Sequence, residues 1–170
     1  MTLGADLELY YENRTFGEPF DLAGRAEKLL KAALSAEGCP YPSELSLLIT
    51  DGPGIRSYNK DTRGIDEETD VLSYPALEFE FPSDFSRISE GDPTLFDLDT
   101  EPERLILGDI LVNMDRIALQ AEELGHSAEY EYSYMLAHSL LHLLGWDHAE
   151  PEDEKKMTEE TLRILAFGGE

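Results

Sequence analysis

Three of the chain's four histidines, His138, His142 and His148, lie within a single stretch of eleven residues. Residues four apart share one face of a helix and lie about 6 Å apart along its axis, so His138 and His142 can direct their imidazoles to one point. Gly145 is placed to end that helix, because glycine adopts a left-handed terminal conformation without a steric penalty. The chain can then turn back and bring His148 to the same point. Three converging neutral imidazoles suit a zinc ion with its fourth coordination position open, as in catalytic sites.

The alternative is that these are ordinary core histidines at a chance spacing. The surrounding helix is apolar nearly all round and should therefore be buried; its apolar residues are Met135, Leu136, Ala137, Leu140, Leu141, Leu143 and Leu144. A buried imidazole without a partner is costly. Two imidazoles on one face, with a third just past a glycine, therefore favour a shared metal ion, one per chain.

The spacing H-x-x-x-H-x-x-G-x-x-H resembles the ligand pattern of the metzincin peptidases. Those enzymes carry a glutamate after the first histidine as general base. Ser139 occupies that position here and cannot serve as that base at neutral pH. The pattern therefore predicts a metzincin-like scaffold with incomplete peptidase machinery.

The stretch from His138 to His148 also resembles the signature of the YbeY family, bacterial metal-dependent endoribonucleases that act in ribosome maturation. Two further stretches support the resemblance: Asn59–Gly64 with Thr69–Pro75, and Leu107–Ile110 followed by Gln120–Glu122. The resemblance runs from about residue 45 to about residue 165, with all motifs in order. It implies a single domain over residues 1–170.

The resemblance assigns a role to Arg63, because the corresponding arginine of the family lies at the active-site groove and is tied to activity. Arg63 is the candidate for holding an RNA phosphate, or the charge that develops on it. A helix from about Gly52 would place Arg56, Lys60 and Arg63 on one basic stripe, which we expect either to contact substrate or to be an ordinary solvated face.

Two further residues are candidates with alternatives beside them. Ser73 lies on a strand that borders the substrate groove in the family, where it could contact the RNA backbone; a buried strand serine is the other interpretation. Asp147 is expected either to accept a hydrogen bond that supports His148 or another ligand, or to be a turn carboxylate.

The net charge of −24, from 37 acidic and 13 basic residues, is unusual for a protein that binds nucleic acid. Exposed charges are screened beyond about 8 Å at physiological salt, so a local patch can outweigh the total. We nevertheless expect weak RNA affinity for the isolated chain. The single Cys39 excludes an internal disulfide and fits a reducing cytosol.

The pattern of apolar residues predicts one α+β domain with a small mixed sheet of about four strands and about five helices. Strands are expected at 6–12, 45–51, 70–74 and 104–112, the last interrupted at Gly108 and lying, by resemblance, at a sheet edge facing the metal cleft. Helices are expected at 20–36, 52–62 and 113–124, in the long histidine-bearing segment capped by Ser127, and from Glu150–Pro151 onward. Residues 83–103 lack periodicity and predict a flexible acidic flap or a disordered loop.

Two of these helices have predicted inner faces. The residues expected to point inward are Ile117, Ala118, Ala121 and Leu124 in the first, and Met157, Thr161, Leu162 and Leu165 in the second.

The resemblance implies a zinc-dependent, single-strand-specific endoribonuclease. It points to 16S rRNA 3′-end maturation and to quality control of the 70S ribosome, with ribosomal RNA and small-subunit proteins as partners and no DNA. In such a site the metal would supply an acidified water, which could attack phosphorus directly or activate a ribose 2′-OH; both routes stay open. The alternatives are a non-catalytic, metal-containing ribosome assembly factor and a metzincin-like zinc peptidase. Met1–Glu8 shows no signal for secretion and no apolar run could span a bilayer, so we expect a cytoplasmic protein.

Overall fold

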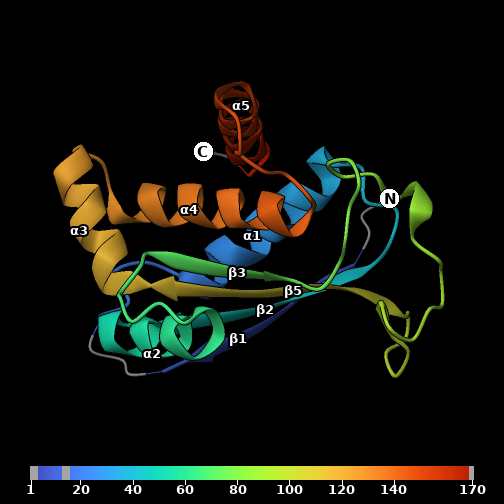
Figure 1. The fold of residues 1–170 in the computed structure, drawn as a ribbon, viewed down its shortest axis with the longest axis horizontal. Helices are drawn as coiled ribbons and strands as arrows, with labels where there is room; N and C mark the ends of the chain where they lie inside the picture. Colours follow the sequence, from blue (N-terminus) through green and yellow to red (C-terminus); the bar gives the residue numbers. More distant parts are fainter. Residues whose placement is uncertain (1–3, 13–15, 169–170) are drawn as a thin grey trace.

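A mixed β-sheet with helices on both faces forms the core of the computed structural model, which describes residues 4–12 and 16–168 (Figure 1). The prediction that the N-terminal segment carries no secretion signal concerns residues 1–8, and residues 1–3 of that segment lie outside the described residues. The elements are β1 (Ala5–Tyr11), α1 (Leu22–Ala36), β2 (Ser43–Thr50), α2 (Gly52–Arg63), β3 (Val71–Pro75), the 3-10 turn η1 (Phe85–Arg87), β4 (Phe96–Asp97), β5 (Arg104–Asn113), α3 (Met114–Leu124), α4 (Ala128–Leu143) and α5 (Pro151–Phe167). The predicted class, a single small α+β domain, is confirmed.

The strands follow the order β1-β2-β5-β3, with the short β4 pairing beside β3 on β5. β1, β2 and β5 are parallel, whereas β3 and β4 run antiparallel to β5. β5 is therefore an interior strand, and the expectation that it forms the edge facing the metal cleft is wrong. β3 is that edge, because its residues 71–75 pair along β5 from Val112 back to Gly108. β5 also continues through Gly108, with a register shift against β2 in place of the predicted interruption.

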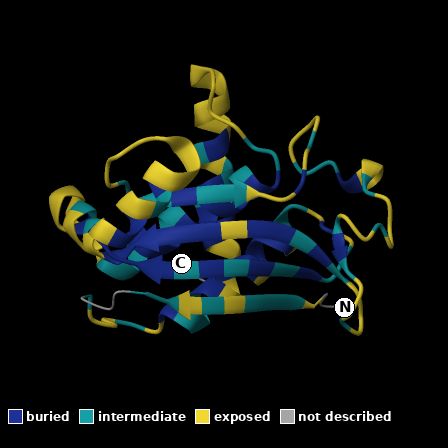
Figure 2. Ribbon diagram, turned by 60° about the horizontal axis from the view of Figure 1, so that its bottom comes forward, coloured by how far each residue is buried: buried dark blue, intermediate teal, exposed yellow. Residues whose placement is uncertain are grey.

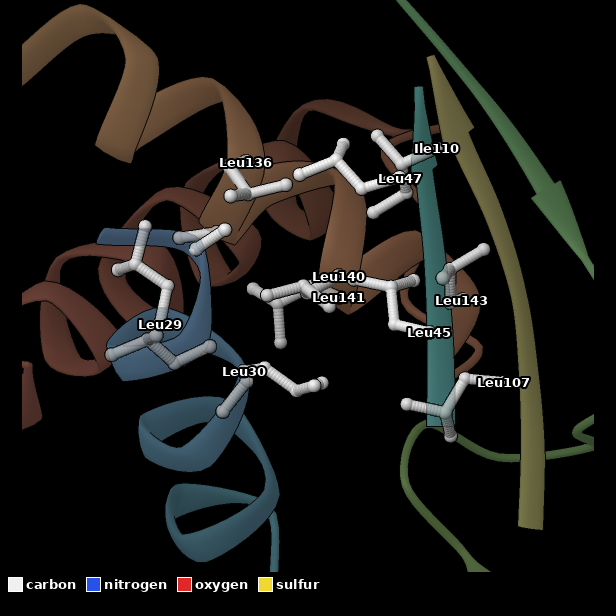
Figure 3. Close-up of a cluster of buried hydrophobic side chains, with 14 of the residues drawn as sticks. Leu29, Leu30, Leu45, Leu47, Leu107, Ile110, Leu136, Leu140, Leu141 and Leu143 are labelled. Carbon is white, nitrogen blue, oxygen red and sulfur yellow. The ribbon is translucent and has the colours of Figure 1, made fainter. Parts of the chain in front are cut away.

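Alternation along β2 divides the molecule into two apolar clusters. Leu45, Leu47 and Ile49 are buried on the face covered by α1 and α4. Figure 3 shows this cluster closing between the sheet and the two helices, with Leu140 and Leu141 of α4 at its centre. The smaller cluster, formed around Ile55, lies under α2 on the opposite face. Figure 2 shows the central strands largely buried, while β1 at the edge is partly exposed.

The helix starts predicted near Gly52 and after Ser127 are confirmed, and each is capped by a side chain. The Asp51 carboxylate accepts a hydrogen bond from the backbone N–H of Gly54 at 2.9 Å, and Ser127 Oγ accepts one from Tyr130 at 3.0 Å. Such caps satisfy N–H groups that have no partner within the helix. They fix where α2 and α4 begin.

Three predicted inward positions on α3 and α5 are wrong. Ala118 is exposed, as are Leu124 (65% exposed) and Leu162 (46% exposed), while Met114 and Ile164 are buried instead. Each helix packs along an apolar stripe that is rotated slightly from the predicted one, a difference too small for a count of periodic residues to resolve.

The disordered-loop interpretation of residues 83–103 is also wrong. These residues contain η1 and β4, and they are anchored by the buried rings of Phe85 and Phe96. No helix in the described part of the chain is long and apolar enough to cross a membrane.

We predict that adjacent leucines of β2 differ sharply in their contribution to stability. Leu47 is fully buried under α4, whereas Leu48 points to the other face and is only half-buried. Leu47→Ala should lower the free energy of unfolding by about 3 kcal/mol, because it leaves a closed cavity. Leu48→Ala should cost about 1 kcal/mol, since solvent can fill the space. Urea denaturation of the two variants tests this, and equal losses would contradict the assigned strand faces.

Candidate metal centre

Helix α4 places His138 and His142 one turn apart on the side that faces β3. Its remaining faces are buried, with Leu136, Leu140 and Leu141 at most 1% exposed. Because these leucines leave the helix no freedom to rotate, the direction of both imidazoles is fixed by packing. The two ring centroids lie 4.8 Å apart.

The turn after α4 returns the chain to the same point. Gly145 has a positive φ of 94°, and a Cβ there would come within 2.5 Å of Phe79 Cβ. Only glycine meets both requirements. The turn brings the His148 ring to 5.7 Å from His138 and 5.1 Å from His142, measured between ring centroids.

The three imidazoles form a group that could hold a metal ion. One ring nitrogen from each of His138, His142 and His148 lies within 4.8 Å of the other two. This spacing is compatible with three ligands around one ion whose metal–nitrogen distances are about 2.1 Å, after a small adjustment. Among the described residues, no other group of histidine, cysteine or carboxylate side chains has such an arrangement.

The protonation states also fit a metal. Burial and the neighbouring imidazoles lower the pKa of His138 to about 4, and burial lowers the pKa of His142 as well. Both rings are therefore neutral at pH 7, as a ligand must be. His142 Nδ1 lies 3.1 Å from the Trp146 carbonyl oxygen, to which it donates as the neutral tautomer with a free Nε2. His138 Nδ1 is buried and has no hydrogen-bond partner in the described residues, a costly state that an additional bound partner would relieve.

The histidines open onto a cavity of about 500 Å³ between α4, β3 and the end of α2. Its lining residues are Arg63, Asp70, Val71, Ser73, Pro75, Met135, His138, His142, Asp147 and His148. Arg63, the last residue of α2, donates from Nη2 to the Ser73 carbonyl at 3.3 Å and lies over the Tyr74 ring. The structure thus brings Arg63 and Ser73 together with the three histidines.

The other predicted substrate-binding residues are elsewhere. Arg56 and Lys60 are exposed and do not line this cavity, and the Arg56 Nε donates to Asp66 Oδ1 at 2.8 Å. Asp147 does line it, and its Oδ1 accepts from the backbone N–H of His148 at 2.7 Å. That contact matches the turn-carboxylate interpretation of Asp147. The predicted basic stripe on α2 therefore contributes only its last member to the cavity.

Asp70 is a charged cavity residue to which the sequence interpretation assigned no role. Its carboxylate accepts hydrogen bonds from the Val71 N–H at 2.7 Å and from Gln120 Nε2 at 3.3 Å, and it faces His138. Its place at the start of the predicted strand 70–74, which by resemblance borders the substrate groove, was the available signal. Arg63 is the cation of the cavity, and Asp70 and Asp147 are its carboxylates. Without a divalent ion, this cavity would not attract a phosphate.

The family model and the curated relatives agree on one family. The family model described as "Endoribonuclease YbeY" matches residues 10–168. Curated proteins named Endoribonuclease YbeY include one from Agathobacter rectalis, 42% identical over 146 residues, which cover 86% of this chain and 87% of that protein. Another from Acetivibrio thermocellus is 45% identical over 139 residues, 82% of each chain. A solution structure from Thermotoga maritima shares the fold with a TM-score of 0.59 at 21% identity, covering 95% of this chain and 88% of that one.

The lowered pKa of His138 predicts how the metal-free protein responds to acid. Its pKa is about 4 when folded, against an ordinary value of 6.5, so the unfolded chain takes up this proton first. This contribution to stability is complete above pH 6.5 and is lost as the pH falls toward 4, by at most about 3 kcal/mol and by less where solvent screens the ring.

The matched variant is His138→Gln, which cannot titrate in this range. Urea unfolding of both chelator-treated proteins at pH 7.5, 6 and 5 should show the wild type losing stability relative to the variant. A difference between the two that is the same at every pH would rule out the buried, neutral state of this ring.

Proposed function

This chain belongs to the YbeY family of endoribonucleases, and from that premise we propose that it is a zinc-dependent, single-strand-specific endoribonuclease. We place its action in the maturation of the 16S ribosomal RNA 3′ end and in late quality control of the 70S ribosome. A cytoplasmic site of action follows from that substrate. One observation carries the proposal: three imidazoles, with one ring nitrogen of each within 4.8 Å of the other two, converge in a cavity that Arg63 also lines.

His138, His142 and His148 would hold the zinc ion, one per chain. When bound, zinc supplies Lewis acidity and lowers the pKa of a water molecule to about 7. The protein's part is to keep His138 and His142 neutral and to orient them. Burial lowers the pKa of both rings, and the Trp146 carbonyl fixes the tautomer of His142.

Arg63 would supply the charge stabilisation. Its guanidinium is exposed and makes one long hydrogen bond, to the Ser73 carbonyl, so its other N–H groups can reach a phosphate. A guanidinium can donate two parallel hydrogen bonds to the non-bridging oxygens of one phosphate. The charge that develops on those oxygens during cleavage would strengthen both bonds, which is how such a residue accelerates the reaction. Ser73, on the same strand edge, would contact the RNA backbone beside it.

The shape of the cavity favours an unpaired strand. The metal-binding rings lie between helix α4 and the edge strand β3, so a phosphate must enter between two elements to reach them. An A-form duplex presents mainly its shape and backbone, and its scissile phosphate cannot approach so closely. The net charge of −24 opposes RNA binding, so we propose that small-subunit proteins or the ribosome itself supply most of the affinity.

The peptidase alternative lacks its general base. Ser139 is fully buried in the core and does not line the cavity. The assembly-factor alternative would need a closed metal site with a fourth protein ligand. The histidines open instead onto a cavity of about 500 Å³.

Removal of one histidine should abolish cleavage. The metal-loaded wild type should cut an end-labelled single-stranded RNA, and His142→Ala should lose at least 100-fold in rate, because the ion loses a ligand. His126→Gln is the matched control, since His126 contacts Glu131 away from the cavity and glutamine keeps a donor there.

Gel analysis of the products measures the rates and also identifies the ends, which separates attack by water from attack by the 2′-OH. Equal cleavage by the wild type and by His142→Ala would mean a contaminating nuclease. No cleavage by a wild type with zinc bound would favour the assembly-factor role.

Arg63 and Arg56 form a second matched pair, on the same helix. Arg63→Ala should lower kcat about 100-fold with a smaller change in KM, because the interaction strengthens in the transition state. Arg63→Lys should recover part of the loss, since lysine keeps the charge but not the paired donors. Arg56→Ala should stay within about twofold. Steady-state kinetics on one RNA checks all three, and equal effects at Arg56 and Arg63 would contradict the assigned role.

A further inference from the structure

A buried carboxylate, Glu37, lies directly behind the metal-binding turn. Its side chain is only 3% exposed, and its Oε1 accepts hydrogen bonds from Trp146 Nε1 and from Ser83 Oγ, each at 2.6 Å. Ser83 also donates its backbone N–H to the Leu144 carbonyl at 2.8 Å. Figure 1 shows the C-terminal end of α1, the loop that follows β3 and the end of α4 meeting on this side of the molecule.

The position is unfavourable for a negative charge. Glu37 caps the C-terminal end of α1, where the helix dipole is negative, and burial together with neighbouring Glu160 raises its pKa to about 7. Arg163 of α5 compensates only in part, since its Nη1 is 4.0 Å from Glu37 Oε2 and donates to Glu160 at 2.5 Å. A neutral residue would be tolerated more easily here, so packing alone does not account for the carboxylate.

A chain of contacts connects this carboxylate to a metal-binding ring. Glu37 holds the indole N–H of Trp146, and the carbonyl oxygen of the same residue lies 3.1 Å from His142 Nδ1. The backbone N–H of Trp146 donates to the Leu141 carbonyl at 3.0 Å, so helix α4 anchors the backbone of this residue while Glu37 anchors its side chain. Trp146, and with it the carbonyl that contacts His142, is therefore fixed at two points.

We propose that Glu37 is a positioning residue of the metal centre, which fixes Trp146 and thereby holds His142 with its Nε2 directed at the ion. The proposal rests on the metal-binding role of His142 given above. Groups that hold a ligand in place from behind typically change metal affinity 10- to 100-fold when they are removed. A residue that only joined α1 to α5 would leave the metal affinity unchanged.

The carboxylate should also respond to pH. Glu160 and Arg163 from α5 are the charged groups that face Glu37, and Trp146 and Ser83 are its neutral partners. A proton on Glu37 would lie on Oε2, on the side of Arg163, since Oε1 already accepts two hydrogen bonds. A neutral carboxyl accepts more weakly than a carboxylate, so the contact to Trp146 should loosen as the pH falls below 7.

The experiment uses Trp146 as its own reporter, because it is the only tryptophan of the chain. Tryptophan emission of the metal-free wild type, followed from pH 5 to 9, should change with a midpoint near 7. Glu37→Gln should lose this transition and bind zinc about tenfold more weakly in competition with a chromophoric chelator. Glu27→Gln, an exposed glutamate of the same helix, should match the wild type in both measurements.

A second variant keeps the test decisive if Glu37→Gln does not fold. Trp146→Phe keeps a ring but removes the N–H, so it should weaken zinc binding to a similar extent. Where the double variant folds, it should be no weaker than either single variant, because both break one connection. Wild-type zinc affinity in both single variants, or losses that simply add, would overturn the proposal. If His142→Ala itself binds zinc as the wild type does, the metal centre, and with it the proposed function, is what fails.

Discussion

The burial of helix α4 between the sheet and helix α1 is the constraint on which the metal centre depends. Leu136, Leu140 and Leu141 are at most 1% exposed, and they fix the rotation of the helix about its axis. A rotation that turned His138 and His142 toward the core would expose these leucines, at a cost of about 2 kcal/mol for each side chain. The hydrophobic effect has no direction of its own, but burial of these leucines on one side of the helix sets the direction in which His138 and His142 point.

The remaining parts of the site attach to this helix through polar contacts. The turn at Gly145 brings back His148, the Trp146 carbonyl sets the His142 tautomer, and the Ser83 N–H holds the carbonyl of Leu144. Each contact is worth about 1 kcal/mol at most in net stability. Their value lies in geometry, because a metal ion tolerates only small displacements of its ligands.

The negative charge of the protein opposes the binding of RNA. A chain of net charge −24 repels RNA at long range, and the cavity has Arg63 against the carboxylates of Asp70 and Asp147. A divalent ion reverses the sign of this cavity locally. In the proposed enzyme the metal would therefore contribute twice, to the chemistry and to the attraction of the scissile phosphate. The acidic surface is the reason that the proposal assigns most of the RNA affinity to small-subunit proteins or the ribosome.

Features that depend on near neighbours along the chain could be predicted from the amino-acid sequence. The helix of His138 and His142, its end at Gly145, the helix start near Gly52, the cap at Ser127 and the α+β class were all predicted, because they follow from spacing within a few turns. Three other features became known only from the folded structure. β3 forms the edge of the sheet, Arg63 lines the cavity while Arg56 does not, and Glu37 contacts Trp146, which lies 109 positions further along the chain. All three depend on the angles at which helices and strands pack against one another, and the periodicity of a single segment does not encode those angles. Leu124 and Leu162 show the same limit, since both fit an apolar stripe and both face solvent.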